Sequence, residues 1–213
     1  MIYKKLNFTK LKENHLYIFI AILSIIISLN PLLNPQLHGE DEATTFIISV
    51  NLLNNLKNFE VFNFLKSLIT ANHPPGRYLL PIPFLEIFGE SIMSMRIPYF
   101  FLWVGSCILS TKIALKIGGK TNALLTGLFL STSGLYNLEV QSLSHGATVF
   151  LGLLLVNEII KNEINEDYII DKKFELFKIN ILLLLGFIFF TSWSAIIFGF
   201  YLYLIVNYYK KKN

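Results

Sequence analysis

The sequence predicts an all-α integral membrane protein with about six transmembrane helices and a long outer loop that carries membrane-surface helices. Only 15% of the 213 residues are charged, against about 25% in soluble proteins. Hydrophobic residues make up 54% of the chain, and several stretches run past about 16 residues without a charge, as expected in lipid. The basic residues are not clustered with aromatic ones, so no nucleic-acid partner is expected.

The predicted spans are apolar stretches separated by lysine-rich segments. Residues 16–33 follow a basic N-terminus, and no small-residue cleavage site follows them, so we interpret them as a retained anchor. Residues 179–206 are too long for one span at about 1.5 Å per residue. The polar cluster at 191–194 favours a hairpin of two short spans there, and a single span, giving five in total, is the alternative. The other spans are predicted at residues 97–115, 123–138 and 143–160.

The charge distribution orients these spans. With six spans, both termini and the loops at residues 112–121 and 161–178 lie on one side, and these four segments hold 14 of the 18 basic residues. Positively charged loops tend to stay in the cytoplasm. We therefore expect cytoplasmic termini, an outward-facing loop at residues 38–95, and a multi-pass protein of a prokaryotic cell membrane. Residues 1–213 are interpreted as one transmembrane module.

The outer loop is predicted to be structured. Residues 43–70 mix large apolar side chains with asparagines, a pattern compatible with one or two helices lying on the membrane surface. Residues 77–88 are apolar but too short to cross a bilayer, and they contain Pro81 and Pro83. We expect both segments to lie along the outer interface.

Two polar clusters bracket the longer of these segments. The first is Glu40-Asp41-Glu42, three adjacent carboxylates whose repulsion favours a shared proton, a metal ion or a cationic partner. The second runs from His73 to Tyr78 through Pro74, Pro75, Gly76 and Arg77. The simpler interpretation, which composition alone favours, is that the acids begin a helix and that His-Pro-Pro is a rigid turn.

Taken in order, five short motifs resemble those of the membrane-bound GT-C glycosyltransferases, in the branch of the protein O-mannosyltransferases and the lipid A aminoarabinose transferase. The resemblance covers residues 16–209 and depends on order and spacing, because no single motif is specific. Gln141 departs from the family, which often has Arg there, and His145 is the alternative contact. Members usually continue with more spans, so the chain resembles the N-terminal module alone. The motifs are Asp41-Glu42-Ala43, His73-Pro74-Pro75-Gly76-Arg77-Tyr78-Leu79-Leu80, Phe88-Gly89-Glu90-Ser91, Arg96-Ile97-Pro98 and Leu138-Glu139-Val140-Gln141.

The resemblance implies inverting transfer of a sugar from a polyprenyl-phosphate donor to an acceptor on the outer face. Asp41 would be the general base, with Glu42 beside it in the catalytic motif. A divalent metal is compatible with oxygen ligands, but the spacing dictates no metal and no other cofactor. The residues implied to contact the donor phosphate or substrate are His73, Arg77, Tyr78, Arg96 and Glu139.

Simpler interpretations stand beside these assignments. His73 can cap its turn, Arg96 can anchor its span at the interface, and Glu139 can be a solvated helix end. For the whole chain, one alternative is a non-catalytic truncated or helper subunit that docks a second chain completing the fold. Another is a transporter or channel, which would need ionisable groups within the spans. The sugar and the acceptor are not identified by the sequence.

Overall fold

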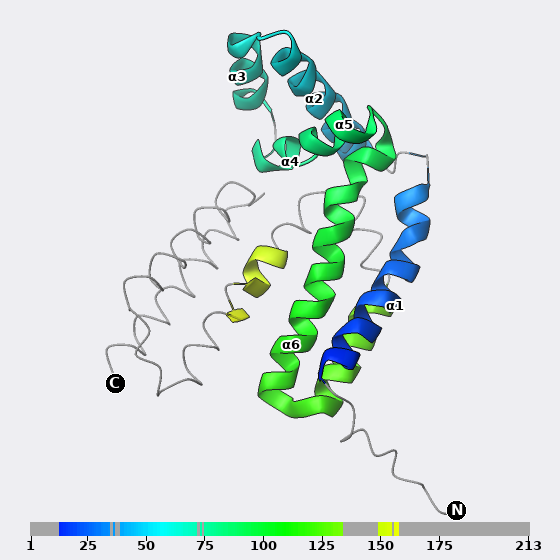
Figure 1. Ribbon diagram of the computed structural model, residues 1–213. Helices are drawn as coiled ribbons and strands as arrows, with labels where there is room; N and C mark the ends of the chain where they lie inside the picture. The colour runs from blue at the N-terminus through cyan, green and yellow to red at the C-terminus, as the bar shows by residue number, and fades with distance from the viewer. Residues whose placement is uncertain are drawn as a thin grey trace, which may run out of the picture.

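The computed structural model describes residues 13–34, 36, 39–71, 73, 75–133, 149–154 and 156–157. Within these ranges every regular element is an α-helix, which confirms the predicted all-α class. Two long helices, α1 (Glu13–Leu33) and α6 (Ile92–Thr132), form an elongated body, and four shorter helices gather at one end of it (Figure 1). The predicted span at 179–206 and most of the one at 143–160 lie outside the described residues, so the six-span topology stays a prediction.

α1 coincides with the first predicted span. It is one of two described helices that are long and apolar enough to cross a membrane, a composition shared by signal sequences and by core helices of soluble proteins. Pro31 lies in its last turn, and the helix ends at Leu33. A proline at this position has no N–H to donate to the carbonyl of residue 27, so it removes one hydrogen bond from the last part of the helix.

α6, the second such helix, is 41 residues long but consists of two arms that meet at Gly119. It begins at a cap, where the Ser91 hydroxyl accepts a hydrogen bond from the Ser94 N–H at 3.1 Å. Gly119 has φ 75° and ψ −172°, a conformation that is essentially restricted to glycine. The chain reverses there, so that the second arm returns beside α1 (Figure 1). The break lies within residues 112–121, the predicted connection between two spans.

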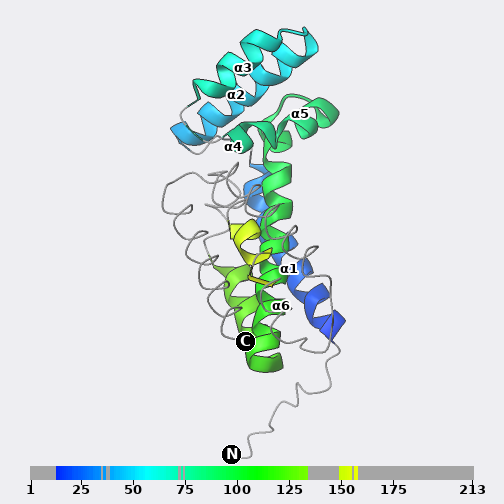
Figure 2. The ribbon, with the colours of Figure 1, turned by 90° about the vertical axis from the view of Figure 1, so that its left-hand side faces the viewer.

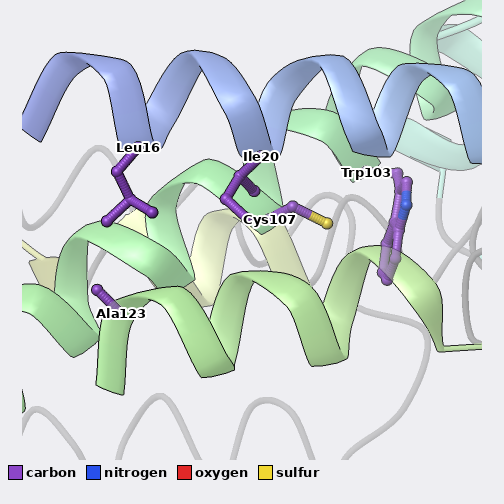
Figure 3. Close-up of a cluster of buried hydrophobic side chains, with 5 residues drawn as sticks. All are labelled: Leu16, Ile20, Trp103, Cys107 and Ala123. Atoms are coloured by element: carbon purple, nitrogen blue, oxygen red, sulfur yellow. The ribbon is translucent and has the colours of Figure 1, made fainter. Parts of the chain in front are cut away.

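The core of the body lies between α1 and the two arms of α6 (Figure 3). Leu16 and Ile20 of α1 cluster with Trp103 and Cys107 of the first arm and with Ala123 of the second. All five side chains are buried. One face of α1 therefore holds the two arms together.

Small residues allow the three helical segments to approach closely. A Cβ atom on Gly127 would lie 2.6 Å from Cδ1 of Ile20 and 2.7 Å from Oγ1 of Thr111, too close for either contact. The buried hydroxyls of Ser24 and Ser131 are 3.0 Å apart and share a hydrogen bond. Close contacts at small residues and hydroxyl pairs of this kind are typical of helices that associate in lipid.

The four shorter helices form a cap at one end of the body, with α2 and α3 side by side (Figure 2). The segment predicted at residues 43–70 is helical but is broken at a turn where Phe59 has φ 58°. The segment predicted at 77–88 is likewise helical and is broken before residue 82. Neither continues into a long helix, and their placement on the membrane surface stays a prediction. The cap helices are α2 (Glu40–Lys57), α3 (Val61–Ile69), α4 (Pro75–Leu79) and α5 (Ile82–Phe88).

A second apolar cluster joins the cap to the body. Leu53 of α2 and Leu85 of α5 pack with Met95 and Tyr99 near the start of α6. These four side chains are buried. α2 and α5 are thereby packed against the start of α6. The candidate site lies at the N-terminal end of α2.

Candidate functional site

The three predicted carboxylates form the first turn of α2. The simpler interpretation that they begin a helix is therefore correct, and their charge is favourable at a helix N-terminus. Their environments differ, however, because adjacent residues on a helix point about 100° apart. The Asp41 side chain is 67% exposed, whereas Glu42 is completely buried. Only Glu40 and Asp41 can therefore meet a molecule from outside.

Glu42 is buried against Arg96, which is also completely buried. Nε of Arg96 donates to Oε1 of Glu42 at 2.6 Å, and Nη2 donates to Oε2 at 2.8 Å. The other three N–H groups of Arg96 donate to the backbone carbonyls of Pro31, Asn34 and Gln36. All five donors are thus occupied. In this arrangement Arg96 has no N–H left for a donor phosphate, the role that the resemblance implied.

Arg77, in α4 of the cap, is the second buried arginine, with 2% of its surface exposed. Its Nε donates to Oγ1 of Thr45 at 2.7 Å, and its Nη2 donates to the backbone carbonyl of Asp41 at 2.8 Å. The Thr45 hydroxyl donates to that same carbonyl at 2.8 Å. The side chain of Arg77 therefore fixes the backbone of Asp41 while its Nη1 group makes no hydrogen bond to a described residue.

The backbone around Arg77 is held from two sides. The Arg77 carbonyl would be bonded by the N–H of residue 81 in a continuing helix, but that residue is Pro81 and has no N–H. The Tyr99 hydroxyl donates to this carbonyl instead, at 2.7 Å. The Ser49 hydroxyl donates to the next carbonyl, that of Tyr78, at 3.0 Å. α4 is thus attached to α2 through Tyr78 and to α6 through Arg77.

His73 lies beside the exposed carboxylate. Its Nε2 is 3.3 Å from Oδ1 of Asp41, and its side chain is 29% exposed. An imidazole at this distance can exchange a proton with the carboxylate or, when protonated, pair with its charge. The structure therefore brings together three of the predicted site residues: Asp41, His73 and Arg77.

Tyr78 completes this group from below the surface. Its side chain is fully buried, and its hydroxyl has no hydrogen-bond partner. Burial raises the pKa of the Tyr78 phenol. The positive charge of Arg77 and the nearby backbone of His73 oppose this effect, and the negative charge of Asp41 reinforces it. A buried hydroxyl without a partner is unusual in a native protein. Because the Tyr78 side chain is fully buried, its hydroxyl does not meet a molecule from outside in this arrangement.

Three residues that the sequence analysis did not single out position the site: Thr45, Ser49 and Tyr99. Two of them could have been found from the sequence, because Thr45 and Ser49 follow Asp41 at intervals of four residues. Residues at this spacing share one face of a helix, and both are buried on α2. Tyr99 gave no such signal, because it lies in a predicted span.

The remaining predicted residue, Glu139, lies outside the described residues, as do His38 and His145. Within the part of the chain that the structure describes, no three His, Cys, Asp or Glu side chains come together as metal ligands. The divalent metal stays a prediction. The chain matches no protein-family model, no curated protein and no solved structure.

Proposed function

We propose that this protein transfers a sugar from a polyprenyl-phosphate donor to an acceptor hydroxyl at the outer face of a membrane. One observation carries the proposal. The exposed carboxylate of Asp41 lies 3.3 Å from Nε2 of His73, beside a buried arginine that holds the Asp41 backbone. A carboxylate, an imidazole and a guanidinium are the groups that such a transfer needs, for the acceptor proton and for the leaving phosphate.

The body supports a membrane location for this site. Core helices of soluble proteins are mostly buried. In α1, by contrast, only 33% of the most apolar 18-residue stretch is buried. Exposed apolar surface of this extent marks contact with lipid or with another protein. The exposed large apolar side chains of α1 are Ile18, Phe19, Ile22, Ile25, Ile26, Leu29 and Leu33.

Asp41 is the general base of the proposed reaction. The acceptor oxygen forms a bond to the anomeric carbon while the bond from that carbon to the phosphate oxygen breaks, with inversion. The acceptor proton moves to the Asp41 carboxylate, which must approach within about 2.6 to 3.2 Å of the hydroxyl. His73 can accept this proton from Asp41 and release it to solvent.

Arg77 is the residue that we assign to the leaving phosphate. Its Nη1 group makes no hydrogen bond to a described residue, and a guanidinium recognises phosphate by paired N–H donors. Tyr78 is not assigned to this anion, because its side chain is fully buried. Arg96 is likewise not assigned to the phosphate, because Glu42 and three carbonyls occupy its donors.

The experiment that tests the proposal measures sugar transfer by the purified protein in lipid nanodiscs. Donors are polyprenyl phosphates carrying radiolabelled sugars, and the acceptor is a panel of lipid and peptide hydroxyls. Loss of a general base costs about 10² to 10⁴ in rate, so Asp41→Asn should remove nearly all transfer. Glu40→Gln is the matched control, because Glu40 is an exposed carboxylate of the same helical turn.

Two outcomes would contradict the proposal in different ways. If Asp41→Asn and Glu40→Gln retain equal activity, the assignment of Asp41 as base is wrong. If the unmodified chain is inactive with every donor, also when a candidate second chain is added, the protein is a non-catalytic subunit.

A further inference from the structure

Arg96 makes five hydrogen bonds to the described part of the chain. Its five N–H groups reach three separate segments: the last turn of α1 through Pro31, the connection through Asn34 and Gln36, and the first turn of α2 through Glu42. Arg96 itself lies in the first turns of α6. A single side chain therefore joins both ends of the connection between the body and the cap.

The charges of Arg96 and Glu42 are each favourable at the helix end beside which they lie. The carbonyls at the C-terminal end of α1 carry partial negative charge, which favours a cation, and the N–H groups at the start of α2 carry partial positive charge, which favours an anion. Arg96 lies at the first of these ends and Glu42 at the second. Both side chains are fully buried, so neither is available to a ligand in this arrangement.

The residue next to Glu42 is the exposed Asp41. Its backbone carbonyl is held by Arg77 and by Thr45, and the next residue is held by Arg96 through two hydrogen bonds. Two buried arginines from different helices therefore fix consecutive residues of the chain. Between them, only the carboxylate of Asp41 is directed outward.

We infer that Arg96 and Glu42 are a pair of positioning residues that holds the Asp41 carboxylate at a fixed place relative to α1 and α6. The inference builds on the proposed function, in which Asp41 is the base. It goes beyond that function because it assigns a role to two residues that touch no substrate. A displacement of about 1 Å in a reacting group can cost about 10² in rate.

The first test measures position without activity. Nitroxide spin labels are attached to Asp41→Cys or, as the control site, to Asn54→Cys on the exposed side of the same helix, in a Cys107→Ala background. Adding Arg96→Gln should increase the mobility of the label at position 41 and leave that at position 54 unchanged. The double variant Glu42→Met with Arg96→Leu, which buries no unpaired charge, should have the same local effect in a well-folded protein.

The second test uses the enzyme with Asp41 intact. Arg96→Lys keeps the charge but loses the paired N–H geometry, so kcat should fall at least about ten-fold while KM changes less than about two-fold. Lys57→Gln is the matched control, since it breaks an exposed ion pair with Glu86 elsewhere in the cap. Its kcat should not change.

The two tests separate the failure of this inference from failure of the proposed function. If the label at position 41 is equally immobile with and without Arg96, in variants that elute as single species, the inference is wrong. The label at position 41 could instead become more mobile without Arg96 while neither the parent protein nor any variant transfers sugar. That result would support the positioning role of Arg96 and Glu42 and would contradict the proposed reaction. A rise in KM with kcat unchanged would assign Arg96 to substrate binding and would also overturn the inference.

Discussion

Asp41 and Glu42 are adjacent in the first turn of α2 but have different environments. Glu42 is buried in a pair with Arg96, and the carboxylate of Asp41 is mostly exposed. A buried charge that loses its partner is strongly unfavourable, because the remaining ion has neither water nor a counter-charge. Exposed charges interact weakly because water screens them. Neutralising Glu42 should therefore destabilise the folded protein far more than neutralising Asp41.

We predict that Glu42→Gln destabilises the folded protein by about 3 to 5 kcal/mol, the cost of leaving Arg96 unpaired. Asp41→Asn should change the free energy of unfolding by less than about 1 kcal/mol, the size of a helix-dipole contribution. Unfolding of the two purified variants in detergent, followed by circular dichroism against temperature, measures this contrast. Equal midpoints for the two variants would show that the buried pair is not formed in solution.

Two buried tyrosines, Tyr78 of α4 and Tyr99 of α6, give a second contrast. The Tyr99 hydroxyl donates to the carbonyl of Arg77 at 2.7 Å, whereas the Tyr78 hydroxyl has no partner. Tyr99→Phe should cost about 1 to 3 kcal/mol, because it leaves that carbonyl unpaired, and Tyr78→Phe should be neutral or stabilising. The same unfolding measurement tests this. A marked loss of stability in Tyr78→Phe would mean that its hydroxyl has a partner in solution.

At the scale of single elements, the helices of the cap were predictable and their contacts were not. The carboxylates mark the start of α2, and the short apolar segment with Pro81 and Pro83 is helical without being a span. Both follow from local rules. The pairing of Arg96 with Glu42 joins residues 54 positions apart. No periodicity links such positions, so the sequence analysis gave both residues functional roles that the buried geometry does not favour.

The reversal of α6 depends on one residue. Gly119 has a backbone conformation that side chains rarely adopt, and a Cβ there would contact nothing within 4 Å. Any penalty for a substitution must therefore come from the backbone alone. Strain of this kind costs about 1 to 3 kcal/mol.

We predict that Gly119→Ala destabilises the body by about that amount, while Gly152→Ala is neutral or slightly stabilising. Gly152 also has open space around its Cβ position, but it lies within a helix, where alanine is favoured over glycine by about 1 kcal/mol. Thermal unfolding in detergent compares the two variants. Equal effects would show that the two arms of α6 do not meet at a left-handed glycine.

At the scale of the whole molecule, the exposed apolar side chains of the long helices and the polar candidate site lie at different places along the length of the protein. The body exposes apolar side chains along α1 and α6, and the candidate site lies in the cap at the end of the body. In the cap, α3 exposes one apolar face formed by Val61, Phe62, Leu65 and Ile69. Such a face is expected of a helix that lies in a membrane interface. The site would then be at the depth where a lipid phosphate presents its sugar.

This arrangement makes a topological prediction that can be tested in intact cells. If the body crosses the membrane, the cap and the reversal at Gly119 lie on opposite sides of it. The charge distribution places the reversal in the cytoplasm, because residues 112–121 carry Lys112, Lys116 and Lys120. The only cysteine of the chain, Cys107, is buried, so the unmodified protein is a suitable blank for thiol labelling.

Asn54 on α2 and Thr121 next to the reversal are both exposed, and each can be replaced by cysteine. A membrane-impermeant maleimide added to intact cells should label Asn54→Cys and should not label Thr121→Cys until the cells are permeabilised. Labelling of both positions in intact cells would show that the body does not cross the membrane. The opposite pattern would place the cap in the cytoplasm, where a base at Asp41 could not serve an acceptor on the outer face.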